Sequence, residues 1–250
     1  MRNRHTYRQW VMAGLGTILL TAALLHPTLA QGRNFPGRRV AAGTRGECLI
    51  VAPGQQDSLP LVVLLPDSNL SLTTQAHPEF FWFNPPIVGQ AVVFELRAVN
   101  ANLQSQQLVY TTQVPIEPPG RLHGLQLPDD GSVPPLEVGQ LYRWSVTPLC
   151  SEEAERNLVW RVTGWVERIA APDTPPGGTA AQQALAAAAA DRWLDAFSTL
   201  KQAMCQAPAT QSANADTWTT LLDQLHLESL QIDLPQLKQQ AIAHLDSLCE

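Results

Sequence analysis

The aromatic run Phe80-Phe81-Trp82-Phe83 constrains the fold of this chain more than any other stretch of its sequence. Aromatic side chains favour β-strands, and consecutive residues of a strand point to opposite sides. Four aromatic residues in a row therefore require an apolar layer above the strand and another below it. Prolines bound the run on both sides, at 78 and at 85–86. The sequence predicts a short strand at the centre of a layered fold, away from any edge.

Short alternating segments around this run indicate a β domain over residues 47–169. Candidate strands lie at 48–51, 61–65, 91–99, 108–114, 122–127, 142–147 and 158–169. Turn residues separate them, with no helical pattern between them, so we expect an immunoglobulin-like or fibronectin-III-like antiparallel β-sandwich. A small barrel is the alternative. Gly164 in the last strand is a candidate bulge that redirects Trp165. The predicted aromatic core comprises Phe80, Trp82, Trp144 and Trp160.

The first 30 residues have the order of a secretory signal peptide. Three arginines without any acidic residue precede an apolar run at 11–25, and Thr28-Leu29-Ala30 provides the small residues of a cleavage site. The run is shorter than the roughly 20 residues needed to span a bilayer, which disfavours an uncleaved anchor. We expect cleavage after Ala30 and an exported protein, periplasmic or extracellular, with no stable membrane span after processing.

Removal of this leader makes the chain more acidic. The full chain has 16 basic and 22 acidic residues, and loss of the three arginines leaves 13 basic residues and a net charge of −9. Binding to nucleic acid depends on neutralising phosphates, so this balance disfavours a nucleic-acid partner. The glycine-rich segment 31–46 carries Arg33, Arg38, Arg39 and Arg45. We interpret it as a flexible, solvated arm; an arm that binds an anionic glycan or lipid is the alternative.

A proline- and glycine-rich linker at 170–179 separates the strands from a helical region at 180–250. Such a composition predicts a domain boundary. An alanine-rich helix over 180–204 has an apolar stripe that includes Trp193 and Phe197. Two further helices follow, one around 218–225 and one from 233 onward. Since each apolar stripe has two others to face, we expect a small three-helix C-terminal domain rather than a docking site for a partner helix.

Four cysteines in an exported chain predict disulfide bonds. Cys48 and Cys150 lie before the linker, whereas Cys205 and Cys249 lie after it. Three helices that run up, down and up place the ends of the first and third at the same end of a bundle. We therefore predict the pairs Cys48–Cys150 and Cys205–Cys249. A metal site is disfavoured, because Cys48 and Cys150 have neither a CxxC partner nor a nearby histidine.

Five ordered motifs resemble one known family. They are TRGEC at 44–48, LPDSNLSLTT at 65–74, HPEFFW at 77–82, YRW at 142–144 and GWVER at 164–168. Together they are similar to the exported, mostly cyanobacterial family called domain of unknown function 928, over most of residues 38–250. The resemblance implies an export signal and an architecture, but no activity, substrate or catalytic residues.

The sequence gives little indication of chemistry. Four histidines lie beyond the leader: His77, His123, His226 and His244. None lies in a metalloprotease, serine hydrolase or nucleotide-binding motif. His77 and Glu79 are a candidate acid–base pair, but a structural histidine at the strand entrance is the simpler interpretation. We interpret Asp129-Asp130-Gly131 as a turn rather than a calcium ligand set, and Asp67-Ser68-Asn69 likewise as a turn. We expect no catalytic residue, cofactor or metal ion.

Two functions remain open at this point. The leading hypothesis is an exported, non-enzymatic module that binds an envelope protein or glycan through sandwich loops or exposed aromatic side chains. The alternative is an envelope carbohydrate hydrolase in which Glu79, Asp129 or Asp130 supply the acids. Two carboxyl groups about 5 to 10 Å apart in one cleft would favour the hydrolase.

Overall fold

The structure is a computed structural model that describes residues 34–41, 59–84, 91–116, 121–149, 161–173, 177–207, 211–243 and 245–249. Several predictions fall outside these residues: the signal peptide at 1–30, the strand at 48–51, the Cys48–Cys150 pair, Trp160 and His244. Within the described part of the chain, no helix is both long and apolar enough to cross a membrane.

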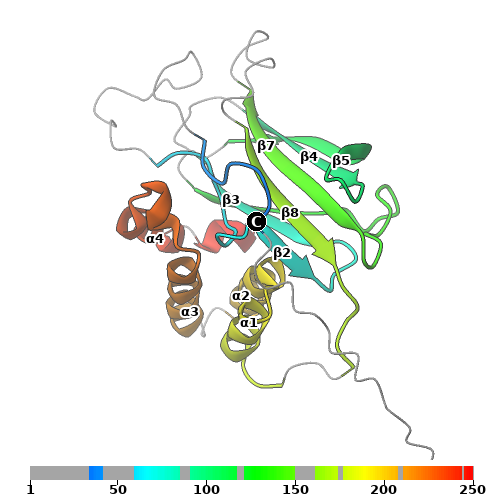
Figure 1. Cartoon of the computed structure of the whole chain (residues 1–250). Helices are drawn as coiled ribbons and strands as arrows, with labels where there is room; N and C mark the ends of the chain where they lie inside the picture. Colours follow the sequence, from blue (N-terminus) through cyan, green and yellow to red (C-terminus); the bar gives the residue numbers. More distant parts are fainter. Residues whose placement is uncertain are drawn as a thin grey trace, which may run out of the picture. The chain divides into compact units, whose positions relative to one another are not determined.

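Strands precede helices along the chain, so the predicted order of a mixed β-then-α protein is confirmed (Figure 1). The strands are β1 (Val62–Val63), β2 (Leu70–Thr73), β3 (Glu79–Phe83), β4 (Ala91–Val99), β5 (Ser105–Pro115), β6 (Leu122–Gln126), β7 (Leu141–Leu149) and β8 (Val162–Arg168). The helices are α1 (Ala180–Ala189), α2 (Trp193–Gln206), α3 (Gln211–Gln224) and α4 (Leu234–Ala243), with the 3-10 helices η4 (Leu227–Leu230) and η5 (Leu245–Cys249).

The strands form two sheets. A three-stranded sheet has the order β1-β3-β6, and a five-stranded sheet has the order β2-β8-β7-β4-β5. All pairs of named strands are antiparallel except β2 and β8, which run parallel with Leu70 opposite Trp165. The prediction of an entirely antiparallel sandwich is therefore wrong. No hairpin joins β2 to β8, so their connection does not require opposite directions.

One side of β3 packs against the five-stranded sheet. The Phe80 ring lies 5.0 Å from the Phe94 ring of β4 and 5.2 Å from the Trp144 ring of β7. Trp82 stacks on Phe94 at 6.1 Å. Phe80, Trp82 and Trp144 are completely buried. Because consecutive residues alternate along a strand, Glu79, Phe81 and Phe83 point to the opposite side.

The opposite side of β3 is covered by helices. The Phe81 ring lies 5.8 Å from Phe197 of α2 and 6.0 Å from Trp218 of α3. Sheets and helices share one hydrophobic core, and residues 33–250 form one compact unit. The predicted boundary at 170–179 separates strands from helices along the chain. The helices nevertheless complete the core of the sheets instead of enclosing a core of their own, because the Phe81 side of β3 needs a cover.

The predicted uninterrupted helix over 180–204 is wrong, because α1 ends at Ala189 and α2 begins at Trp193. Asp191 between them has a left-handed backbone, with φ of 57°. Its carbonyl oxygen accepts a hydrogen bond of 2.8 Å from the backbone N–H of Leu72 in the edge strand β2. The break thus docks the start of α2 onto the sheet. The predicted last helix, from 233 onward, is α-helical only as far as Ala243, and the 3-10 helix η5 follows it.

Residues 34–41 are packed against the sheets, contrary to the predicted flexible arm. Phe35 lies 5.3 Å from Trp165, ring to ring. The buried Arg39 guanidinium donates to the carbonyl oxygens of Leu65 (2.8 Å) and Leu225 (2.9 Å) and to the Asp67 carboxylate (2.5 Å). Burial lowers the pKa of Arg39, and the Asp67 charge opposes that shift. This arginine therefore joins the start of the domain to its helices.

Gly164 is not the predicted bulge. The pairing of β7 with β8 is regular, and Gly164 lies opposite Trp144. A Cβ atom at Gly164 would lie 2.6 Å from the Trp144 indole and 2.4 Å from Cδ1 of Leu65. The glycine is needed because two buried side chains occupy the space of its missing side chain.

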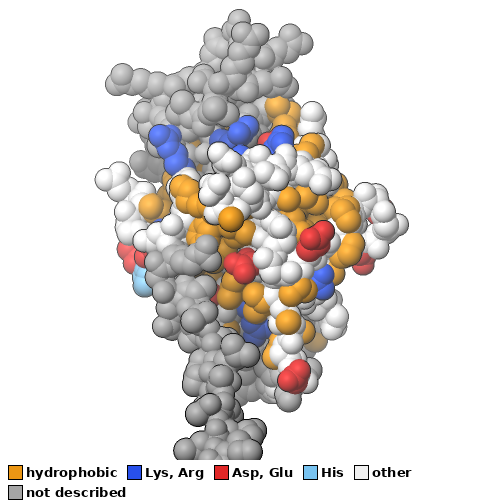
Figure 2. All heavy atoms as spheres, turned by 45° about the vertical axis from the view of Figure 1, so that its right-hand side comes forward, with side chains coloured by type: hydrophobic (Ala, Val, Ile, Leu, Met, Phe, Trp, Pro, Cys, Tyr) orange, Lys and Arg blue, Asp and Glu red, His pale blue; other side chains and the backbone are white. Residues whose placement is uncertain are grey.

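The large hydrophobic side chains exposed among the described residues are Leu108, Val138, Leu185 and Ile242, and none is aromatic. On the face shown in Figure 2, hydrophobic side chains form small patches separated by polar groups. The exposed aromatic side chains expected for ligand binding are thus not found in this part of the chain.

Candidate functional site

A polar pocket of about 480 Å³ lies where β3 and β6 meet α2 and η5. We call it the α2 pocket, because α2 provides the largest share of its wall. Its lining residues are Gln75, His77, Glu79, Gln126, Asp195, Ser198, Thr199, Lys201, Gln202, Cys205, Gln206, Leu248 and Cys249.

The polar side of α2 forms one wall of this pocket. Asp195 is followed three and four residues later by Ser198 and Thr199, and Gln202 lies four and three residues after these two, so all four share one side of the helix. The apolar side of the same helix, which includes Phe197, is buried in the core. The amphipathic helix therefore contributes one side to stability and presents the other to the pocket.

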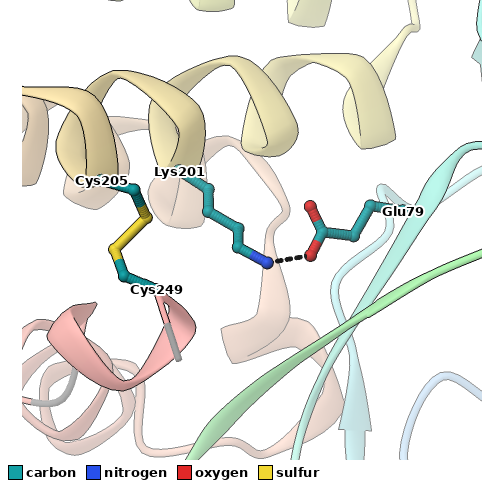
Figure 3. The surroundings of a disulfide bond; sticks show 4 residues. All are labelled: Glu79, Lys201, Cys205 and Cys249. Carbon is teal, nitrogen blue, oxygen red and sulfur yellow. Dashed lines mark hydrogen bonds and ion pairs between the residues drawn. A yellow bond between two sulfur atoms is a disulfide. The ribbon is translucent and has the colours of Figure 1, made fainter.

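Glu79 is the charged group at the start of β3, and its side chain is only 5% exposed. It forms an ion pair with Lys201 of α2, and Ser198 Oγ donates to its other carboxylate oxygen at 3.3 Å. Figure 3 shows the Lys201 side chain extending from α2 toward this carboxylate. Gly124 in β6 makes room for the arrangement, since a Cβ atom there would lie 2.6 Å from Glu79 Oε1.

Asp195 is the second carboxylate of the pocket and is also buried. It accepts hydrogen bonds from Thr73 Oγ1 (2.6 Å), from the Thr74 backbone N–H (3.1 Å) and from Thr74 Oγ1 (3.0 Å). Arg192 Nη1 lies 3.7 Å away. Ser71 of β2 accepts a further bond of 3.0 Å from the Leu194 N–H. These contacts fix the first turn of α2 to the edge strand, so Asp195 anchors the wall.

A disulfide closes the far end of the pocket. Cys205 of α2 is bonded to Cys249 of η5, across 44 residues of sequence. Both residues are exposed and line the pocket. Figure 3 shows Lys201 and Cys205 on successive turns of the same side of α2. The bond therefore holds the C-terminal 3-10 helix beside the ion pair.

The two members of the candidate acid–base pair have different partners in the structure. His77 lines the pocket, but its Nε2 lies 3.2 Å from the Val133 carbonyl oxygen, whereas Glu79 is paired with Lys201. His123 packs at 4.8 Å on the Trp82 ring, and burial, with a contribution from the Lys201 charge, lowers its pKa to about 4. His226 lies 3.3 Å from Asp67 at the other end of the helical layer.

The other predicted acids do not line the α2 pocket. Asp130 accepts hydrogen bonds from Ser132 N–H (2.9 Å) and Ser132 Oγ (2.5 Å) in an exposed turn, which agrees with the turn interpretation of 129–131. These bonds lower the pKa of Asp130. Asp67 also lies in a turn, where it pairs with Arg39. No group of histidine, cysteine and acidic side chains among the described residues could hold a metal ion.

The residues that build the α2 pocket fall almost entirely within a single family model. That model, described as Domain of Unknown Function (DUF928), matches residues 40–234, which is most of the chain. The chain belongs to this family. Of the pocket residues of this DUF928 protein, only Leu248 and Cys249 lie beyond the matched range. No curated protein and no solved structure matches the chain.

Sequence reasoning identified Glu79 and His77 in this DUF928 chain but missed Lys201, Ser198 and Asp195. The available signal was the polar side of α2, which has only two charged residues between 194 and 206. A helix side that is merely solvated usually carries more charge. Its hydroxyl and amide groups line the α2 pocket.

Proposed function

We propose that this DUF928 protein is an exported, non-enzymatic binding module of the cell envelope, and that its α2 pocket binds an uncharged, hydroxyl-rich envelope glycan. The predicted signal peptide at 1–30 supports export. The Cys205–Cys249 disulfide supports an oxidising compartment. The proposal includes the finer likeness to an immunoglobulin-like or fibronectin-III-like sandwich, which the two packed sheets support.

The observation that carries the proposal is the chemistry of the pocket wall. Its volume of about 480 Å³ is in the range of small-molecule sites. Its charged groups are already paired, Glu79 with Lys201 and Asp195 with Arg192. The remaining polar wall consists mainly of amides and hydroxyls, which can both donate and accept hydrogen bonds. Such a wall suits a neutral ligand with many hydroxyl groups.

Calorimetric titration with chitotetraose, a neutral oligomer of N-acetylglucosamine, and with cellotetraose, a neutral oligomer of glucose, tests the proposal. The double variant Gln75→Ala/Gln202→Ala should bind about thirtyfold more weakly, because each lost hydrogen bond is worth roughly 1 kcal/mol and two are removed. Gln239→Ala, which changes an exposed amide of α4, is the matched control. Equal affinity of the double variant and the control, or no binding of either probe, would overturn the proposal.

The hydrolase alternative has one observation in its favour, because Glu79 and Asp195 are two carboxylates that line the same pocket. Both are engaged as acceptors by the side chains around them. Mass spectrometry of the same probes after incubation with the protein separates the two functions. We expect intact probes. Cleavage that disappears in Glu79→Gln would support the hydrolase and contradict the non-enzymatic proposal.

A further inference from the structure

Three arginines lie together on the outer face of the five-stranded sheet. Phe94, Leu96 and Trp144 point inward, so Glu95 and Arg97 of β4 and Arg143 of β7 point outward. Arg97 and Arg143 are directly opposite each other in the β4–β7 register. Like charges in this position repel, so the fold alone gives no reason for the pair.

The third arginine, Arg161, precedes β8 and joins the cluster through Thr147. Its Nε donates to Thr147 Oγ1 at 3.1 Å, and Thr147 shares the outward side of β7 with Arg143. The charges of Arg161 and Arg97 both lower the pKa of Arg143, in addition to the larger effect of its burial. The three guanidinium groups are therefore close enough to interact.

The described residues provide little negative charge for this cluster. Glu95 lies 3.4 Å from Arg97, and neither Arg143 nor Arg161 has an ion pair with any carboxylate in the part of the chain that the structure describes. Glu167, the other acidic residue in the strands of this sheet, is in register with Leu141, away from the row that holds Arg97 and Arg143. Counted over the described residues, the cluster thus has positive charge in excess, although the chain as a whole is acidic.

Residues with hydroxyl groups lie in the rows between the arginines. Thr163 pairs with Ser145 in the row next to that of Arg143; Thr163 is half-buried, whereas Ser145 is buried. From Arg97 to Arg161 the cluster crosses two strand spacings and about four residues along the strands, on the order of 15 Å in all. One small anion cannot span that distance. A chain that carries repeated negative groups and hydroxyl groups can.

We propose that the outer face of the five-stranded sheet binds an acidic polysaccharide, with Arg97, Arg143 and Arg161 contacting its anionic groups and the half-buried Thr147 and Thr163 facing its hydroxyl groups. Arginine suits this task, since its planar fork matches carboxylate and sulfate oxygens. The proposal does not depend on the α2 pocket, which is formed by other elements.

A polysaccharide fits the cluster better than an anionic membrane does. Membrane surfaces recruit segments with clusters of about 4 to 8 basic residues, and three arginines beside Glu95 fall short of that number. The arginines also project from the paired strands of a rigid sheet, which suits contacts at fixed spacing along an extended polymer.

The test compares binding of the full protein to immobilised polygalacturonate, dextran sulfate and neutral dextran. We expect binding to the two acidic polymers but not to neutral dextran, with affinity that falls as salt concentration rises. Arg143→Gln/Arg161→Gln should weaken binding at least tenfold. Lys238→Gln, which removes a basic group of α4, should leave it unchanged. The melting temperature of the double variant should be equal to or above that of the wild type, because the change relieves repulsion.

Three results would overturn the proposal. One is wild-type affinity for the acidic polymers in Arg143→Gln/Arg161→Gln. Another is binding to phosphatidylglycerol vesicles without binding to either polymer, which would identify a membrane site. The third is a clear fall in the melting temperature of the double variant, which would assign the arginines a structural role. The pocket variant Gln75→Ala/Gln202→Ala should bind the acidic polymers with wild-type affinity. The proposal for the sheet face and the proposal for the α2 pocket can therefore fail independently.

Discussion

The two sides of β3 differ in what they face and in what they do. Phe80 and Trp82 point toward the five-stranded sheet, where Phe80 contacts Phe94 and Trp144 and Trp82 contacts Phe94. Phe81 points toward the helices and is equally buried, but Glu79 on the same side reaches the α2 pocket. One side of the strand serves stability alone, whereas the other combines stability with a polar site.

This difference follows from the kind of layer on each side. A sheet that packs on β3 provides a continuous apolar surface, since the side chains of both inner faces interdigitate. A helix covers a strand only with its apolar stripe, and the polar side of the helix begins next to that stripe. Glu79 forms its ion pair with Lys201 at the border between the apolar stripe and the polar side of α2. A pocket is therefore expected on the helical side of β3 and not on the sheet side.

The largest expected effect is the loss of an aromatic side chain from either side of β3. Trp82→Ala and Phe81→Ala should each reduce the free energy of unfolding by about 3–5 kcal/mol, because both side chains are completely buried. Trp144→Ala should cost a similar amount. Urea denaturation followed by tryptophan fluorescence and by helical circular dichroism measures these losses.

Both probes should report one transition in every variant, since sheets and helices share a core. If Phe81→Ala unfolded the helices at lower urea concentration than the sheets, the helical region would be a separate domain. Wild-type stability of Trp82→Ala would show that the sheet side of β3 is not the core.

The disulfide is expected to have the next largest effect, and only on the helical side. Cys205→Ser/Cys249→Ser opens a link across 44 residues, for which the chain-entropy model gives a loss of up to about 4 kcal/mol. The variant should also loosen η5 and weaken ligand binding in the α2 pocket. Non-reducing peptide mapping checks the pairing and tests the predicted Cys48–Cys150 bond. A peptide that links Cys48 or Cys150 to the helical pair would contradict both predictions.

Local sequence patterns predicted the strands better than their arrangement. Alternation identified β4 and β7, and the aromatic run identified β3 and its need for two covering layers. The pairing of β2 with β8 depends on residues far apart in sequence, which no local pattern reports. The break between α1 and α2 was hidden by alanine, since alanine favours a continuous helix. The tertiary contact of Asp191 with β2 overrides that preference.

The candidate site was predictable only in part, because it too is formed by residues far apart in sequence. Glu79 and His77 were noticed because they flank the aromatic run. Lys201 lies more than a hundred residues later, and only the docking of α2 brings it to Glu79. Arg39 seemed to belong to a solvated arm because its three acceptors come from distant segments. Charged residues whose partners are remote in sequence are those that sequence patterns place least well.

A smaller effect concerns pH and the sheet side of β3. The pKa of His123 is lowered to about 4 from its ordinary value of 6.5, chiefly by burial and further by the Lys201 charge. Between these two values the unfolded chain binds a proton that the folded protein does not, so stability falls as pH decreases from 6.5 to 4. Two and a half pKa units correspond to a loss of about 3 kcal/mol.

The control for this prediction is His123→Phe, which keeps a ring against Trp82 but cannot bind a proton. Stability measured by urea denaturation at several pH values should fall less steeply below pH 6.5 in this variant than in the wild type. Parallel curves for the two proteins would show that His123 does not contribute to acid destabilisation.

The smallest and most local comparison uses one glycine from each side of β3. Gly164 faces Leu65 and the Trp144 indole, which are completely buried and cannot move freely. Gly164→Ala should therefore cost about 1–3 kcal/mol through overpacking. A new Cβ at Gly124 would meet Glu79 Oε1 at 2.6 Å, the end of a flexible side chain, and the buried Phe81 ring at 3.1 Å. Gly124→Ala should cost less than Gly164→Ala, because its shortest contact is with a group that can move and the reduced freedom of the unfolded chain offsets part of the strain.

The two alanine variants should differ most in the pocket. Gly124→Ala displaces the Glu79 carboxylate from Lys201, so it should alter chitotetraose binding while the protein remains nearly as stable as the wild type. Gly164→Ala should lower stability and leave the affinity of the folded protein unchanged, because its neighbours lie on the sheet side. Calorimetry measures the affinity of each variant for chitotetraose, and urea denaturation measures its free energy of unfolding. Equal effects of the two variants on affinity would contradict the assignment of the site to the helical side of β3.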